Sequence, residues 1–175
     1  MIAFLDKMEE IINKIVELVL TPMFMILAGV SLLQVIFRYF LRISLPWSEE
    51  LARYLFIYTT YLGSVIGVSR NIHIDITVVD LFLNKMEPAK RARWNNIIEI
   101  VASFISAVAL GWITYLAIPY LMGVYKFGQR TPAMGLSLCV PVFSVPLGMG
   151  LMFLLYAKKF IKGVALFSKG GEVLD

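Results

Sequence analysis

Cysteine, histidine and charged residues are all scarce in this chain. Among its 175 residues there are one Cys and one His, and only 16% of the residues are Asp, Glu, Lys or Arg. A single cysteine, Cys139, excludes a disulfide within the chain. One Cys and one His also fall short of the ligand sets that form zinc sites. We therefore expect no metal site and no bound cofactor in this chain.

Charge is absent above all from four long apolar runs, in a sequence that is 59% hydrophobic. The runs without Asp, Glu, Lys or Arg are Leu18–Phe37, Tyr54–Ser69, Ile100–Tyr125 and Thr131–Ala157. A helix needs about 20 apolar residues to cross a bilayer. The sequence therefore predicts an all-α integral membrane protein, a single four-helix membrane domain over residues 1–175, with transmembrane helices at about 15–37, 47–69, 96–120 and 132–157.

The segments outside these runs are short. The N-terminal segment has apolar residues at helical spacing with acidic residues between them, so it either lies on the membrane surface or leads directly into the first span. Residues 75–87 mix β-branched apolar residues with isolated charges and predict a short interfacial amphipathic helix. A β-strand over HIDITVV is the alternative, but its open edge would leave backbone groups poorly satisfied at a membrane surface.

Lysine and arginine are distributed unevenly between the two sides of the predicted membrane domain. Eleven of the sixteen lie before span one, between spans two and three, or after span four. The other five are Arg38, Arg42, Arg53, Lys126 and Arg130. Because positive charge is retained preferentially in the cytoplasm, we expect both the N- and C-termini to be cytoplasmic. The five other cations would then face outward, which is the periplasm in a Gram-negative bacterium.

The lack of charge within the spans also limits what the chain can do alone. Ionisable groups inside membrane helices usually mark routes for ions, protons or substrates. The hydroxyl groups inside the spans are not accompanied by a His and an acid, so no serine-type triad can be assembled. We therefore expect no enzymatic activity and no catalytic residue. The net charge of +4 does not indicate nucleic-acid binding, because the basic residues lie at the ends of apolar runs rather than along one stripe.

The stretch PWSEELARYLF concentrates polar residues at the start of the second span. Pro46 suits the first turn of a helix, where Glu49 and Glu50 complement the helix dipole. Glu49 also lies four residues before Arg53, a spacing that favours an ion pair on one helix face. Glu50 projects towards Tyr54 instead. We therefore single out Glu50 as the carboxylate that is less easily explained by the helix alone.

Two further features of this span indicate how it is held. Trp47 is expected to anchor the helix at the membrane interface. Gly63 and Gly67 form a GxxxG motif, which predicts a face for close packing against another helix.

Three polar residues follow the second span. Arg70 can extend its guanidinium to the lipid headgroups on the cytoplasmic side. His73 and Asp75 are two residues apart and do not share one helix face, so they make no site by themselves. The surface of a partner could complete one.

Taken in order, these residues resemble the small membrane subunit (Q-type, DctQ-like) of tripartite ATP-independent periplasmic (TRAP) transporters. The matching residues are Arg38, Tyr39, Pro46, Trp47, Glu50, Leu51, Gly63, Arg70, His73 and Asp75. The motif covers residues 38–75, and spans three and four match by hydropathy alone. One departure is Tyr58, where many relatives have Trp, although the aromatic character is kept.

The resemblance implies an accessory subunit in the bacterial inner membrane that does not itself carry solute. Its partner would be a large M-type membrane subunit holding the sodium and substrate sites, and a periplasmic substrate-binding protein would deliver an organic acid such as a C4-dicarboxylate, sialic acid or a related sugar acid. We expect the spans to brace the large subunit within the membrane lipids. The residues expected to help seat the binding protein are Arg38, Arg42, Glu49, Glu50, Lys126 and Arg130.

Two other functions remain open at this point. The chain could act alone, as an oligomeric small exporter or channel, because its four spans are joined by short loops and contain prolines. It could also be a membrane enzyme or a cofactor protein, although one His and one Cys make axial ligation sparse. Solute flux through liposomes that contain only this chain distinguishes the first alternative, and a bound pigment or metal distinguishes the second.

Overall fold

The computed structural model describes residues 2–70 and 88–168, with side chains for residues 6–70 and 94–165. Four long helices make up nearly all of this part: α1 (Ile2–Ile36), α2 (Pro46–Ser69), α4 (Pro88–Lys126) and α5 (Cys139–Ser168). A short π-helix, η1 (Phe37–Leu41), continues α1. The four long helices are each long and apolar enough to cross a membrane. The predicted all-α class with four membrane helices is therefore confirmed.

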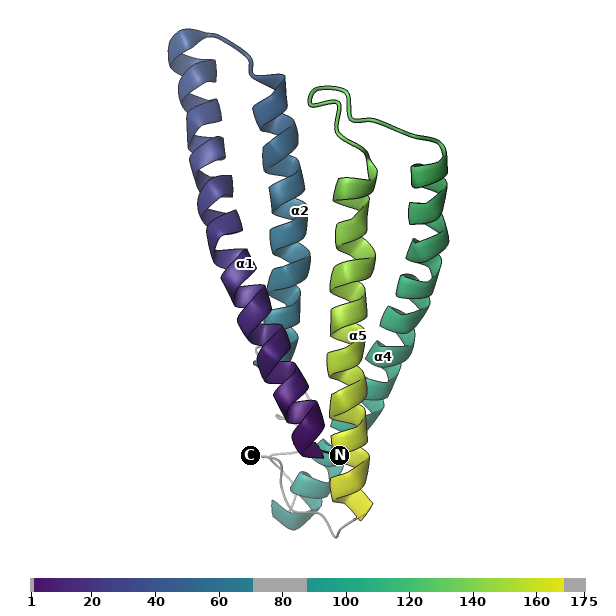
Figure 1. Ribbon diagram of the computed structural model, residues 1–175. Helices are drawn as coiled ribbons and strands as arrows, with labels where there is room; N and C mark the ends of the chain where they lie inside the picture. Colours follow the sequence, from purple (N-terminus) through teal and green to yellow (C-terminus); the bar gives the residue numbers. More distant parts are fainter. Residues whose placement is uncertain (1, 71–87, 169–175) are drawn as a thin grey trace.

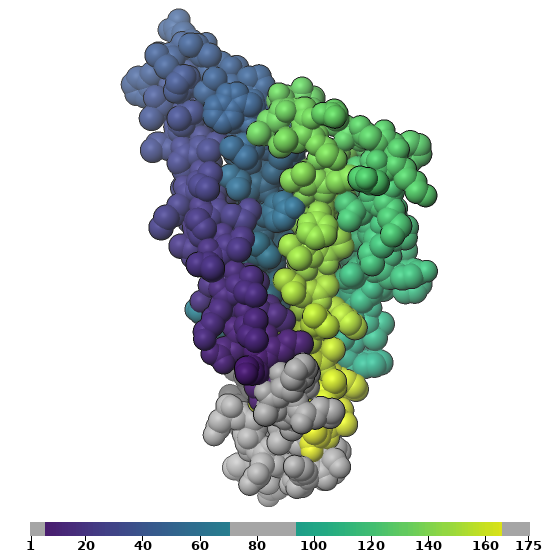
Figure 2. All heavy atoms as spheres, viewed as in Figure 1, coloured from purple at the N-terminus to yellow at the C-terminus, as the bar shows by residue number. Residues whose placement is uncertain are grey.

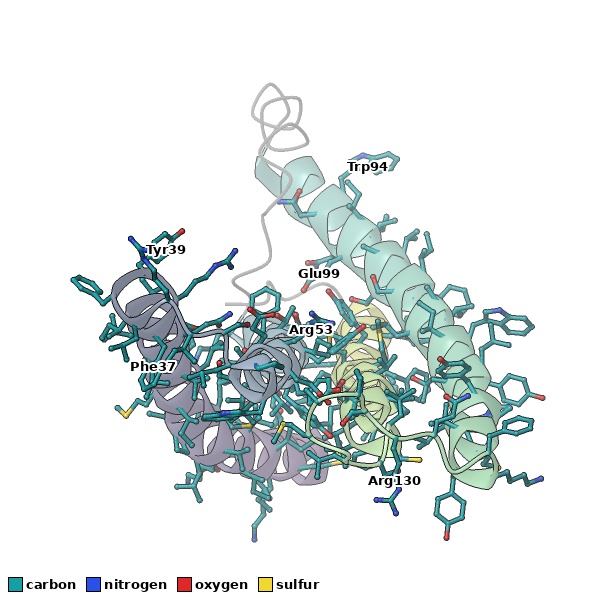
Figure 3. The ribbon with its side chains drawn as sticks, turned by 90° about the horizontal axis from the view of Figure 1, so that it is seen from above. Phe37, Tyr39, Arg53, Trp94, Glu99 and Arg130 are labelled. Atoms are coloured by element: carbon teal, nitrogen blue, oxygen red, sulfur yellow. The ribbon has the colours of Figure 1, made fainter. Side chains whose placement is uncertain are left out.

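The helices stand side by side in a single layer, in the order α1, α2, α5, α4 (Figure 1). Seen from above, α1 and α4 lie on opposite flanks of the central pair (Figure 3). Only 6% of the apolar window of α1 and 11% of that of α4 is buried, against 22% for α2 and 28% for α5. All four helices also reach the surface on one face (Figure 2). The flanking helices therefore leave most of their apolar surface to lipid or to another protein.

The two ends of this layer differ in what they contain. The connections formed by residues 42–45 and 127–138 lie at one end, which we call the loop end (Figure 1). The start of α1 and the end of α5 lie at the other end, which we call the terminal end. The predicted topology would place the loop end outside the cell, and this orientation stays a prediction.

The core is a narrow apolar cluster shared by α1, α2 and α5. Its buried members are Val16, Leu62, Val65, Val68, Met152 and Leu155. The three residues from α2 are spaced three apart, so a single stripe of this helix faces inward. Gly63 and Gly67 do not belong to that stripe, and a Cβ atom added at either position would meet no atom within 4 Å. The GxxxG motif is therefore not the face through which α2 packs against the other described helices.

The N-terminal segment is part of the first helix, because α1 is continuous from Ile2 to Ile36. Of the two predicted arrangements, it leads directly into the span. At the other end η1 stops at Arg42, whose backbone is left-handed with φ 56°. The amide of Ile43 then donates to the carbonyl of Phe37 at 3.1 Å and closes the turn. This left-handed residue ends the helix in the way that glycine often does.

The start of α2 follows the sequence prediction. Pro46 is its first residue, after Leu45 as the capping residue, and Glu49 lies in the first turn. The missing amide hydrogen of proline costs nothing there, since the first amides of a helix have no partner within it. The hydroxyl of Ser48 donates to the carbonyl of Leu45 at 2.8 Å, and its side chain is fully buried.

The fourth span begins later than predicted. The sequence prediction started it at residue 132, but α5 begins at Cys139. The reason is the proline and glycine in this segment: Pro141 fits the first turn of the helix, whereas Gly135 adopts a left-handed φ of 65°. Residues 127–138 therefore form a connecting loop, which we call the 127–138 loop. The predicted interfacial helix at residues 75–87 lies outside the described residues.

Close helix packing occurs at glycines that the sequence analysis did not single out. A Cβ atom added at Gly148 of α5 would lie 2.6 Å from Cβ of Tyr61 on α2. One added at Gly163 would lie 2.7 Å from Cγ1 of Ile100 on α4. Small residues allow this approach, which is how helices associate in a solvent of lipid tails. Both positions are on α5, the helix that contacts all three of the others.

Replacing Gly148 by Ala should destabilise the chain by about 1 to 3 kcal/mol, because the new methyl group collides with a Cβ atom that cannot rotate away. Gly67→Ala is the matched control, since open space surrounds that position and alanine favours helix by up to about 1 kcal/mol. Thermal unfolding in detergent measures both variants. Equal midpoints for the two variants would contradict this account of the α2–α5 contact.

Candidate functional site

The loop end is organised around the carboxylate of Glu50, in the first turns of α2. Its side chain is only 6% exposed. One oxygen, Oε1, accepts from the hydroxyl of Tyr54 at 2.5 Å, so the predicted neighbourhood of these two residues is confirmed. The other oxygen, Oε2, accepts from the backbone amides of Ala133 at 2.8 Å and Met134 at 3.0 Å. We call these three hydrogen bonds the Glu50 clamp.

The Glu50 clamp joins α2 to a loop that is itself tightly folded. Within the 127–138 loop, the amide of Thr131 donates to the carbonyl of Leu136 at 2.8 Å, and the amide of Leu136 donates to the hydroxyl of Thr131 at 3.0 Å. The amide of Leu138 donates to the carbonyl of Gln129 at 2.9 Å. These bonds close a small hairpin. The amides of residues 133 and 134 point out of its tip towards Glu50.

Five cations are exposed at the loop end, among apolar and aromatic side chains. The exposed basic residues here are Arg38, Arg42, Arg53, Lys126 and Arg130. Glu49 is exposed beside them, whereas Glu50 is buried. None of these five cations forms an ion pair among the described residues. The surface therefore presents positive charge that is not neutralised by the part of the chain the structure describes.

Several other residues singled out from the sequence lie at this end without a direct bond between them. Trp47 is 44% exposed, as suits a residue at a membrane interface. Glu49 and Arg53 do not pair, although their spacing allows it, so the expected ion pair is wrong for this conformation. Arg130 donates to the carbonyl of Gly135 at 3.2 Å, and in Figure 3 its side chain points away from the helices.

A second polar cluster fastens the terminal end. Lys158 of α5 is only 7% exposed, and its ammonium group pairs with Asp6 at 2.5 Å and with Glu9, both on α1. The carboxylate of Glu9 also accepts from the hydroxyl of Ser69 at the end of α2. The amide of Asn13 donates to the same hydroxyl at 2.5 Å. Three helices therefore meet at one network of hydrogen bonds.

Arg70 adds an exposed contact beside this network. Its guanidinium pairs with the carboxylate of Glu17 on α1, and its backbone amide closes α2 by donating to Ile66 at 2.9 Å. The predicted contact of Arg70 with lipid headgroups stays a prediction. In the structure, the guanidinium group forms its ion pair with Glu17 of the same chain. His73 and Asp75 lie outside the described residues.

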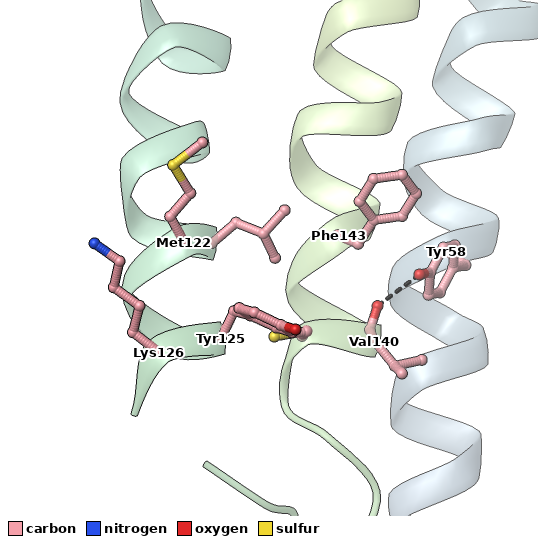
Figure 4. Close-up of a pocket in the computed structure, with 8 residues that line it drawn as sticks. Tyr58, Met122, Tyr125, Lys126, Val140 and Phe143 are labelled. Atoms are coloured by element: carbon pink, nitrogen blue, oxygen red, sulfur yellow. Dashed lines mark hydrogen bonds between the residues drawn. The ribbon is translucent and has the colours of Figure 1, made fainter. Parts of the chain in front are cut away.

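An apolar groove of about 540 Å³ opens between α2, α4 and α5 near the loop end (Figure 4). Tyr58, Met122, Val140 and Phe143 contribute to its walls. The hydroxyl of Tyr58 donates to the carbonyl of Val140 at 2.5 Å, so the tyrosine that departs from the expected tryptophan ties α2 to α5. Lys126 is the charged residue among those that line the groove, and the rest of the lining is apolar or aromatic.

Neither of the two polar clusters matches the ligand set of a metal site among the described residues. No group of three His, Cys, Asp or Glu residues within 6–70 and 94–165 is placed to hold a metal ion. The two polar clusters use their charges to join helices of the same chain. What the arrangement can do is hold four membrane helices in a fixed layer and present a cationic, partly aromatic surface at the loop end.

The sequence analysis missed the cluster at the terminal end. A signal for it existed, because Asp6, Glu9 and Asn13 recur at helical spacing and Lys158 directly follows the last charge-free run. It also missed the partners of Glu50. These partners are backbone amides, which every residue carries, so no side-chain pattern could have revealed them.

Comparisons with known proteins agree on one family. A family model described as "Tripartite ATP-independent periplasmic transporters, DctQ component" matches residues 27–166. The chain is 30% identical over 149 residues to the sialic acid TRAP transporter small permease protein SiaQ of Vibrio cholerae, and the match covers 82% of this chain and 78% of that protein.

Of two further relatives, one is named for another solute and one is a much longer protein. The C4-dicarboxylate TRAP transporter small permease protein DctQ of Rhodobacter capsulatus is 26% identical over 131 residues, which is 75% of this chain and 53% of the relative. The sialic acid TRAP transporter permease protein SiaT of Haemophilus influenzae is 33% identical over 85 residues, which is 49% of this chain but only 13% of that protein.

Replacing Lys158 by Ala should lower the free energy of unfolding by roughly 1 to 3 kcal/mol, because the half-buried Glu9 then loses its cation. This range lies between the values for exposed and for buried ion pairs. Thermal unfolding of the purified chain gives the measurement. Lys7→Ala serves as the control, since Lys7 is exposed on α1, the helix of Glu9, and pairs with no described residue. If both variants unfold at the same temperature, the cluster does not fasten the terminal end.

Proposed function

Because the chain belongs to the DctQ family of small TRAP transporter subunits, we propose that it is an accessory subunit that braces a large membrane subunit and helps to dock a periplasmic substrate-binding protein. It works in the bacterial inner membrane, surrounded by lipid. The transport that it supports is sodium-coupled uptake of an organic acid, with the sodium and substrate sites in the large subunit. The single layer of helices, with its two uncovered flanks, is the observation that carries this proposal.

The proposed bracing role follows from how little of each flank is covered. A layer one helix thick encloses no space, so a solute that crosses the membrane needs another protein around it. The apolar windows of α1 and α4 are 6% and 11% buried, which leaves broad surfaces on both sides of the layer. The SiaT relative supports a permease as the partner, because the stretch that resembles this chain is a small part of that larger permease.

The proposed docking role rests on the charges at the loop end. Five exposed cations lie there, and no described residue neutralises them. Such a surface attracts a partner with an acidic face and mainly sets the rate and register of encounter. Glu50 is not part of this contact surface in our proposal, because it is 6% exposed and its oxygens are already occupied.

The substrate class is drawn from the relatives. One is named for sialic acid and one for C4-dicarboxylates, and both of these solutes carry carboxylates. We take an organic acid of this kind as the cargo of the complete transporter. The chain itself offers no described charged group within its apolar runs to bind such an anion, which agrees with a cargo site in the large subunit.

Reconstitution tests the accessory role directly. Liposomes that contain the large subunit, this chain and the periplasmic binding protein should take up radiolabelled N-acetylneuraminate or succinate when a sodium gradient is imposed. Omitting this chain should reduce uptake at least tenfold. Equal uptake without it would refute the proposal, and flux through liposomes with this chain alone would favour an autonomous exporter or channel instead.

Charge reversal tests the docking surface. The double variant Arg38→Glu, Arg42→Glu should weaken binding of the binding protein to the reconstituted complex about tenfold or more, with most of the loss in the association rate, because like charges now meet across the contact. The difference from wild type should shrink as salt is raised. Lys7→Glu, at the terminal end, is the control. Unchanged association of the double variant would remove this surface from the docking site.

A further inference from the structure

The 127–138 loop is bonded to α2 at its tip through the side chain of Glu50. Its tip amides, at Ala133 and Met134, are bonded to Glu50 Oε2 at 2.8 and 3.0 Å. Both donors are neutral and the acceptor is a carboxylate, which makes these bonds stronger than those between neutral groups. The residues joined in this way are 83 and 84 positions apart in the sequence, so the clamp fixes tertiary structure rather than a local turn.

The same loop carries exposed groups of the proposed docking surface. Phe127 is 81% exposed, and Arg130 is exposed three residues later. The guanidinium of Arg130 donates to the carbonyl of Gly135 within the loop, at 3.2 Å. Arg130 therefore moves with the hairpin, and the position of the hairpin over α2 is set at its tip by Glu50.

We propose that Glu50 is a positioning residue, which holds the 127–138 loop in the conformation that docks the periplasmic binding protein. This inference rests on the proposed docking function. Glu50 does not touch the partner. It acts by fixing Arg130 in place before the encounter, so that binding does not have to order the loop, and pre-ordering of this kind strengthens association. The chemistry also explains why a carboxylate is buried here, since each of its three partners donates a hydrogen bond to it.

Glu50→Gln is the informative substitution. Glutamine has nearly the same shape but no charge. Its single oxygen, turned towards the loop, would accept from the two loop amides in neutral hydrogen bonds, which are weaker than the charge-assisted bonds that the carboxylate accepts. Hydrogen exchange of the intact complex should show faster exchange at the amides of residues 133 and 134. The dissociation constant for the binding protein should rise about tenfold, while co-purification with the large subunit is kept.

Tyr58→Phe is the matched control. It also removes one hydrogen bond of α2, the one to the carbonyl of Val140, but it leaves the Glu50 clamp intact. Its dissociation constant should stay within about twofold of wild type. A tenfold rise in this variant too would mean that general loosening of the helices weakens docking, and would overturn the proposal.

A double-mutant cycle separates positioning from a merely structural role. Arg130→Ala alone should weaken docking, but in the Glu50→Gln background it should add little, because the arginine is already misplaced. Additive losses would overturn the proposal. So would unchanged exchange at residues 133 and 134, an unchanged dissociation constant, or loss of the large subunit on purification of Glu50→Gln.

Failure of the docking function itself would give a different result. In that case Arg130→Ala and the Arg38→Glu, Arg42→Glu variant would both leave the dissociation constant unchanged. If these variants weaken docking and Glu50→Gln does not, the docking surface stands and only the positioning role of Glu50 is refuted.

Discussion

Apolar helices in a bilayer gain little from burying against each other, because lipid tails are as apolar as leucine. This constraint governs the whole structure. Four helices in a single layer have few neighbours each, so their arrangement depends on polar contacts and on close approach of the backbones. The polar contacts lie at the two ends of the layer, where Glu50 binds the amides of the 127–138 loop and Lys158 binds Asp6 and Glu9. Between the ends, the apolar runs contain no charged residues, and the helices are held together mainly by close packing.

The central helix α5 makes the closest of these packing contacts. Gly148 lies against Tyr61 of α2, and Gly163 lies against Ile100 of α4, each at a distance that excludes a side chain on the glycine. The two contacts connect α5 with a different neighbour on each side. Together with the end clusters they relate all four helices to one another, although α1 and α4 lie on opposite flanks. A layer held in this way can be rigid without a thick core.

The fold could be predicted from the sequence because it follows from a single quantity, the length of the charge-free runs. The start of α2 at Pro46 was equally accessible, since the first turn of a helix tolerates proline. The start of α5 was not, because the apolar run continues through the loop and hydropathy cannot separate Pro132 from Pro141. The packing glycines were missed for a related reason. The GxxxG spacing predicted close packing at Gly63 and Gly67. The structure shows it at Gly148 instead, because close packing depends on which helices are neighbours.

The charge distribution also bears on how one fold can serve different transporters. The buried charged groups that the structure describes, Glu50 and Lys158, bond to other parts of the same chain and are therefore not available to bind a solute. Relatives of similar identity are accordingly named for solutes as different as sialic acid and C4-dicarboxylates. The exposed charges of the loop end are not consumed in this way, and they lie on the surface that a soluble partner would meet. Under the proposed function, these exposed charges serve to select a partner protein rather than a substrate.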